Sequence, residues 1–149
     1  MGKTLKGKFR PDNPEKYLGD VGLILYRSSW EFKFMRWCDT REDIIAWNSE
    51  ETRVRYYDPV AKRTRTYYPD FYIRRQRPDG IIIEELVEVK PARQVKGPPV
   101  NPKRKTRAWL NEVYTYATNT AKWKAASEFC EDRGWNFRII TENEIKPNR

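Results

Sequence analysis

The segment of residues 71–90 constrains the fold most strongly, because its pattern predicts two paired β-strands. Two runs rich in β-branched and aromatic residues flank a Pro-Asp-Gly turn at residues 78–80, and such a turn favours a hairpin. In the second run, strand alternation directs Glu88 and Lys90 to one face and the adjacent valines to the other. Because a carboxylate is costly to bury, the charged end of this apolar strand requires an explanation.

The remaining patterns predict an α+β domain in which helices flank a central mixed sheet. A first helix is predicted near residues 30–40, where apolar residues recur at helical spacing. A long helix is predicted over residues 108–133, with a break near Asn119 and a stop at Gly134. The strands are expected to be mostly antiparallel. They are predicted at residues 23–26, 44–49, 52–58, 64–77, 81–90 and 135–141.

The chain of 149 residues has the length of one ordinary domain. Residues 1–20 are basic and rich in Pro, Gly and Asn, which predicts an extended N-terminal arm. Residues 21–149 are predicted to form a single domain. Within it, residues 91–107 contain four prolines and many Lys and Arg but no acid, so they are expected to form an irregular, solvated loop.

The net charge of +9 predicts a polyanionic partner, with nucleic acid as the first candidate and a membrane surface as the second. The sequence has neither an apolar run long enough to cross a bilayer nor the hydrophobic stretch of a signal peptide, so an intracellular location is expected. The chain contains no histidine, which excludes Ser-His-Asp triads, histidine-ligated zinc fingers and nucleases with a histidine base. Catalysis must therefore rest on carboxylates, lysine, tyrosine or a hard metal ion.

Asp70 belongs to the strand predicted to pair with that of Glu88, so the two carboxylates are expected to lie side by side. Such a pair suits Mg²⁺, which binds oxygen ligands and retains waters that contact a substrate phosphate. Lys90 could then orient a metal-bound water. The tripeptide alone is weak support, because about two acid-x-Lys tripeptides are expected by chance and three occur. Solvated charges on an edge strand are the competing interpretation, and Glu84 and Glu85 are interpreted in that way.

Glu31 in YRSSWE, Asp70 in YPDF, and Glu88 with Lys90 in EVK resemble the signature of the PD-(D/E)xK nucleases, the restriction-endonuclease-like superfamily. Their order is similar to that in the end-cleaving endonuclease subunit of heteromeric transposases. Over nearly the full chain, segments such as MGKTLKGKF and DRGWNFRIITENE also resemble the head completion nucleases of T-even-like tailed phages. This resemblance implies a restriction-endonuclease-like core and a metal-dependent DNA endonuclease.

The resemblance implies a role for each of these residues. Asp70 would be the central metal ligand, Glu88 the second carboxylate, and Lys90 the residue that positions the attacking water. Glu31 would complete the acidic cluster directly or through a water, although by default a helical glutamate near a lysine is a solvated charge. Mg²⁺ would be the cofactor, with Mn²⁺ as a substitute. The transposase subunit often has Gln at the position of Glu88, so the resemblance does not imply whether one or two metal ions bind.

Two groups of residues are candidates for DNA contact. Arg27 and Ser28 precede the first helix, where Ser28 can cap the helix and the helix N-terminus also favours a phosphate. The basic loop follows Lys90 directly and is expected to bind DNA without sequence preference. Its candidate residues are Arg93, Lys96, Lys103, Arg104, Lys105 and Arg107.

The acidic and lysine set favours a metal-dependent nuclease, and the resemblance implies a magnesium-dependent endodeoxyribonuclease of phage origin that acts in head completion on packaged DNA or DNA ends. The expected partners are DNA and phage portal or neck proteins, without a membrane. The expected location is the host cytoplasm during assembly, and the virion. One alternative is a non-catalytic DNA-binding or structural head completion protein of the virion. Another is a cellular repair or junction-resolving enzyme with the same core. The complete acidic and lysine set favours the enzyme over the structural protein, because binding alone does not require it.

Overall fold

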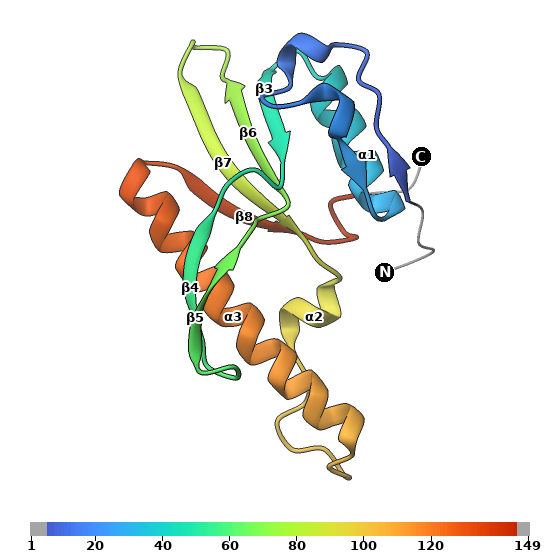
Figure 1. The fold of residues 1–149 in the computed structure, drawn as a ribbon, viewed down its shortest axis with the longest axis vertical. Coiled ribbons are helices and arrows are strands. Elements are labelled where there is room, and N and C mark those ends of the chain that lie inside the picture. The colour runs from blue at the N-terminus through green and yellow to red at the C-terminus, as the bar shows by residue number, and fades with distance from the viewer. Residues whose placement is uncertain (1–5, 146–149) are drawn as a thin grey trace.

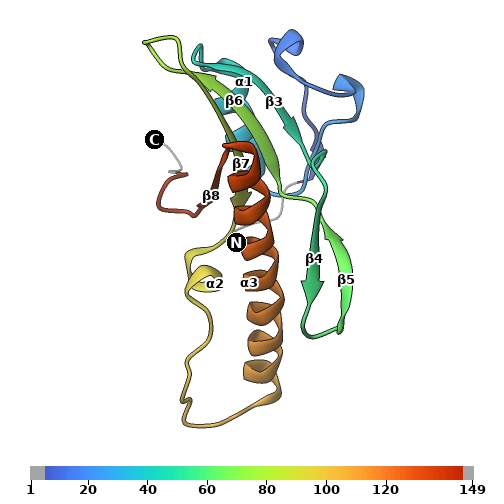
Figure 2. The same ribbon diagram turned by 90° about the vertical axis from the view of Figure 1, so that its left-hand side faces the viewer.

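In the computed structural model, which describes residues 6–145, the chain forms a three-layered α+β domain (Figure 1). A four-stranded sheet lies between α1 (Ser29–Thr40) and α3 (Arg107–Arg133) (Figure 2). This arrangement confirms the predicted fold class. No helix in the described part of the chain is both long and apolar enough to cross a membrane.

The central sheet has the strand order β3-β6-β7-β8, in which β8 is parallel to β7 and the other pairs are antiparallel. The crossover through α3 permits this parallel pairing, because parallel strands cannot be joined by a tight turn. The hairpin predicted over residues 71–90 is confirmed as β6 and β7. The strands are β1 (Gly7–Lys8), β2 (Leu25–Tyr26), β3 (Ile44–Ser49), β4 (Val54–Asp58), β5 (Arg63–Tyr67), β6 (Phe71–Gln76), β7 (Ile82–Val89) and β8 (Asn136–Ile140).

The β4–β5 hairpin does not join the central sheet. Its two strands pair only with each other, and the hairpin extends beside α3, away from the sheet (Figures 1 and 2). The pattern predicted the strand of β4, but it predicted residues 64–77 as one strand, which the structure divides into β5 and β6 at residues 68–70. It also could not show this separation from the sheet, because pairing partners distant in sequence are set by the tertiary fold. The hairpin and α3 together form an extension below the sheet.

Each face of the sheet covers its own hydrophobic core. Val87 and Val89 pack in the core beneath α1. Leu86 packs on the opposite face with Trp123 of α3. Strand alternation therefore directs Glu88, like Leu86, to the side of α3 and the β4–β5 hairpin.

Residues 6–20 of the N-terminal segment are held on the domain at a few points. β1 pairs with β2, and Phe9 and Tyr17 are buried in the core beneath α1. The high content of Pro, Gly and Asn did not indicate this packing, which depends on two aromatic side chains. Residues 1–5 of the predicted arm lie outside the described residues.

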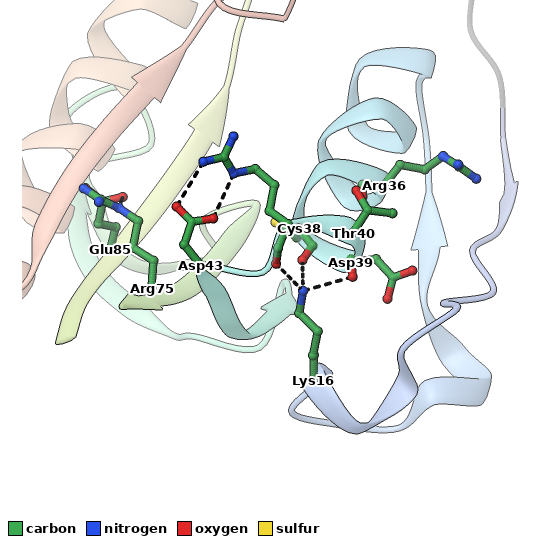
Figure 3. Close-up of polar contacts among 9 residues, drawn as sticks. Lys16, Arg36, Cys38, Asp39, Thr40, Asp43, Arg75 and Glu85 are labelled. Atoms are coloured by element: carbon green, nitrogen blue, oxygen red, sulfur yellow. Dashed lines mark hydrogen bonds and ion pairs between the residues drawn. The ribbon is translucent and has the colours of Figure 1, made fainter. Parts of the chain in front are cut away.

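Lys16 links this segment to the C-terminal end of α1 through hydrogen bonds. Its ammonium donates to the carbonyls of Cys38, Asp39 and Arg41 at distances of 2.6, 2.9 and 2.8 Å (Figure 3). The carboxylate of Asp39 in turn accepts hydrogen bonds from the backbone N–H groups of residues 12–13. A cation suits this place, because the last carbonyls of a helix lack helical partners and carry partial negative charge.

The second half of the chain departs from the prediction at two helices. α3 is not broken near Asn119, because that side chain is buried against the domain within a continuous helix. Gly134 ends α3 in the left-handed conformation, with φ of 72°, as predicted. The loop of residues 91–107 begins with a short helix, α2 (Ala92–Lys96), and is therefore not irregular throughout.

Glu85 corrects the interpretation of the first glutamates of β7 as surface charges. Its side chain is only 3% exposed and lies 3.1 Å from Arg138 of β8 and 3.5 Å from Arg75 of β6. Two guanidinium groups thus compensate one buried carboxylate across three neighbouring strands. Glu84 is half-buried and accepts a hydrogen bond from the hydroxyl of Tyr72.

Candidate active site

Asp70 and Glu88 meet at one end of the sheet. Phe71 pairs with Val87 in the antiparallel β6–β7 ladder, so the next register position sets Asp70 opposite Glu88. Oδ2 of Asp70 accepts a hydrogen bond from the N–H of Val89 at 2.8 Å. The fold therefore brings together the two carboxylates that the sequence pattern selected.

Asp70 lies in an environment that disfavours its ionised form. Burial is the main cause that raises its pKa well above the usual value, and the charges of Glu88 and Glu31 raise it further. The N–H of Val89 and the charge of Lys90 act in the opposite direction without cancelling the effect. A partly buried carboxylate of this kind gains stability from a cation that reaches it.

Glu88 is 5% exposed and is held by two side chains. Its Oε1 accepts a hydrogen bond of 2.5 Å from the hydroxyl of Tyr67, and its Oε2 lies 3.3 Å from Nζ of Lys90. Burial and the charge of Glu88 raise the pKa of Tyr67, so the phenol stays protonated as a donor. The backbone N–H of Lys90 donates to the carbonyl of Ile140 at 2.9 Å, which fixes the lysine beside β8.

Glu31 reaches this region from the first turn of α1. Its backbone N–H donates to Oγ of Ser28 at 3.1 Å, and its own carboxylate accepts the N–H of Arg27 at 2.9 Å. The pKa of Glu31 is raised, mainly by burial and also by the charges of Glu50 and Glu88. The hydrogen bond from the N–H of Arg27 opposes this shift. Helix capping by Ser28 is thus confirmed. Ser28 is only 4% exposed, and its contact with a DNA phosphate stays a prediction.

Sequence patterns did not indicate Glu50, which also lies beside the site. The guanidinium of Arg27 pairs with the carboxylate of Glu50. The backbone N–H of Glu50 donates to the carbonyl of Asp70 at 3.0 Å. Its φ of 56° is uncommon for a residue other than glycine. This backbone conformation occurs where the chain reverses after β3, and the local sequence did not predict it.

The predicted basic residues after Lys90 divide into two groups. Arg93 and Lys96 are exposed on α2, which begins two residues after Lys90. The other four are also exposed but belong to the loop before α3 and to its first residue, at the end of α3 that extends away from the sheet (Figure 1). They are Lys103, Arg104, Lys105 and Arg107.

The donors in the site are suited to a hard divalent cation, since they are all carboxylate oxygens. Burial first, and then the charges of Glu88 and Glu31, raise the pKa of Asp70, and a bound cation would favour its ionised form. Within residues 6–145, however, no three acidic or thiol side chains are gathered closely enough to form a ready metal cage. Both oxygens of Glu88 are engaged by Tyr67 and Lys90, so a side chain would have to turn for the cluster to assemble.

Comparison with known proteins identifies the family of this chain. The family model described as TnsA-like endonuclease N terminal matches residues 41–142, a segment that contains Asp70, Glu88 and Lys90 but not Glu31. The head completion nuclease of Enterobacteria phage T4 is 40% identical over 144 residues, which cover 94% of this chain and 93% of that protein. The chain therefore belongs to the TnsA-like endonucleases, which are restriction-endonuclease-like nucleases.

Proposed function

We propose that this nuclease is a metal-dependent DNA endonuclease that hydrolyses phosphodiester bonds. The observation that carries the proposal is the meeting of Asp70, Glu88 and Lys90 where β6 begins and β7 ends. A buried and a partly buried carboxylate next to a lysine are costly for the fold alone and are typical of catalytic sites. The net charge of +9 supports DNA as the substrate.

Each side chain has a distinct task in the proposed reaction. Asp70 and Glu88 would hold Mg²⁺ or Mn²⁺, with Glu31 as a further ligand directly or through a water. When bound, the ion supplies charge for the phosphoryl oxygens and lowers the pKa of a coordinated water. Lys90 would orient the attacking water and offset the charge that develops on the phosphate. Tyr67 would orient Glu88 through the hydrogen bond from its hydroxyl.

We also propose that the enzyme acts in phage head completion on packaged DNA or DNA ends. The name of the T4 relative and its match over nearly the whole chain support this role. Portal or neck proteins would then be partners, in the host cytoplasm during assembly and in the virion. The alternative is a structural head completion protein without catalysis.

Plasmid nicking measured with Mg²⁺, with Mn²⁺ and with EDTA tests the proposed function. Purified protein should nick supercoiled DNA with either ion and should not do so in EDTA, with activity restored when excess Mg²⁺ is added. Lys90→Ala, measured in parallel, should be inactive and excludes a contaminating nuclease. Cleavage in EDTA would contradict metal dependence, and a complete lack of cleavage would favour the structural alternative.

Removing charge from the loop before α3 should weaken DNA binding in a salt-dependent manner. Each phosphate contact contributes about 0.9 to the slope of log K against log salt, so Lys103→Gln with Lys105→Gln should lower the slope by about 2. Fluorescence anisotropy of labelled duplex DNA in EDTA measures the slope. Lys33→Gln with Arg36→Gln, at exposed positions of α1, is the control of equal charge. Equal slopes for the two double variants would remove this loop from the DNA-binding surface.

A further inference from the structure

Lys122 occupies an unusual position on α3. The side of the helix that faces the domain carries the buried residues Asn119, Trp123, Ala126 and Cys130. Lys122 lies three residues after Asn119 and four before Ala126, so it belongs to the same side of the helix. It is half-buried, where the helical pattern would favour an apolar residue.

The contacts of Lys122 direct its charge toward the candidate active site. Its Nζ lies 5.5 Å from the ring centre of Tyr67 and 6.0 Å from that of Tyr56. The hydroxyl of the same Tyr67 holds Glu88, and Glu88 contacts Lys90. One tyrosine ring therefore separates Lys122 from the proposed catalytic carboxylate.

Lys122 has no ionic partner in the described part of the chain, since no carboxylate of residues 6–145 lies within 4.0 Å of its Nζ. The pKa of Lys122 is lowered, mainly by burial and then by the positive charge of Lys90. The charge of Arg65 on β5 lowers it further. Glu88 and Asp58 oppose this effect, but Lys90 and Arg65 already contact those two carboxylates, at 3.3 and 3.4 Å. The charges of Lys90, which follows β7, and of Arg65 therefore act on Lys122, while the two neighbouring carboxylates are engaged by those residues and not by Lys122.

We propose that Lys122, together with Lys90 and Arg65, forms a binding site for a backbone phosphate of the DNA substrate between α3 and the β4–β5 hairpin. The site rests on the proposed function and extends it, because it directs the bound DNA strand from the candidate active site toward the β4–β5 hairpin. A phosphodiester anion suits the site, since it can accept hydrogen bonds from two ammonium groups and a guanidinium together. The tyrosine rings hold the lysine stem in place before DNA arrives.

DNA binding by Lys122→Met tests this site, because methionine keeps the apolar stem but removes the charge. All proteins carry Asp70→Asn to prevent cleavage, and binding of a fluorescein-labelled duplex is measured in EDTA at several salt concentrations. Lys122→Met should bind about ten-fold more weakly at low salt, as expected for one charged contact, with a salt slope smaller by about 1. Lys122→Arg should retain most of the affinity.

Lys124→Met is the matched control on the same helix. Lys124 is exposed and pairs with Glu128 at 2.8 Å, so its loss should leave the affinity and the slope unchanged. The inference is overturned if Lys122→Met matches Lys124→Met, or if it binds more weakly with an unchanged salt slope, which would indicate a purely structural lysine. Lys122→Gln replaces the methionine variant if that variant unfolds. Because binding is read without cleavage, failure of this site is distinguishable from a wild-type protein that does not cleave DNA.

Discussion

Replacing Asp70 with asparagine should reduce DNA cleavage by a factor of about 10³ or more without weakening the fold. An asparagine oxygen can still accept the hydrogen bond from the N–H of Val89, which Asp70 accepts at 2.8 Å. The substitution removes the negative charge that a divalent cation requires. The rate of plasmid nicking and the thermal unfolding temperature in EDTA measure the two effects separately.

The raised pKa of Asp70 also fixes how stability should change with pH. Because burial and Glu88 raise the pKa, the folded protein binds the proton more tightly than the unfolded chain does. This contribution to stability is fully present below the unfolded pKa of about 3.9 and is lost as the pH rises through the raised pKa of the folded protein. In EDTA, Asp70→Asn should remove this part of the pH dependence and should be at least as stable as wild type at neutral pH.

Asp132→Asn, at an exposed position of α3, is the control for loss of one carboxylate. It should leave both the cleavage rate and the pH dependence of unfolding unchanged. Substantial cleavage by Asp70→Asn would refute the assignment of Asp70 as a metal ligand. A large fall in its unfolding temperature would show that the carboxylate is needed by the fold.

The pairing of Asp70 with Glu88 could be predicted because every step is local. A Pro-Asp-Gly turn sets the hairpin, and alternation then fixes which side chains share a face. The same reasoning applies to the capping of α1 by Ser28 and to the end of α3 at Gly134, where the signals lie within a few residues of the element.

Features that depend on partners distant in sequence could not be predicted. Lys16 contacts carbonyls more than twenty residues away, and Asn119 stays helical because the domain buries it. Tyr67 belongs to an aromatic run, and nothing local shows that its hydroxyl reaches Glu88. Glu85 is the clearest case, because the arginines that permit its burial come from two other strands.

Replacing Glu85 with alanine should destabilise the domain by about 2–4 kcal/mol. Removing one partner of a buried ion pair leaves the other charge uncompensated, and here two guanidinium groups lose their shared carboxylate. The cost falls below that of a fully buried pair, because the side chains of Arg75 and Arg138 are 30% and 43% exposed and can turn to solvent. At about 2–4 °C per kcal/mol for a domain of this size, the unfolding temperature should fall by roughly 5–15 °C.

Glu84→Ala is the matched control, since Glu84 is the preceding residue of β7 with a side chain 31% exposed and an arginine 3.9 Å away. Its effect on stability should be smaller, because a partly exposed ion pair contributes little and the hydroxyl of Tyr72 loses one hydrogen-bond acceptor. Cleavage per folded molecule at low temperature should survive Glu85→Ala, since Glu85 contacts none of the proposed catalytic residues. Loss of cleavage in a folded Glu85→Ala protein would mean that the ion pairs also position Glu88 three residues along the strand. Survival of cleavage would instead assign the two buried glutamates of β7 to separate tasks, with Glu85 stabilising the sheet and Glu88 serving the reaction.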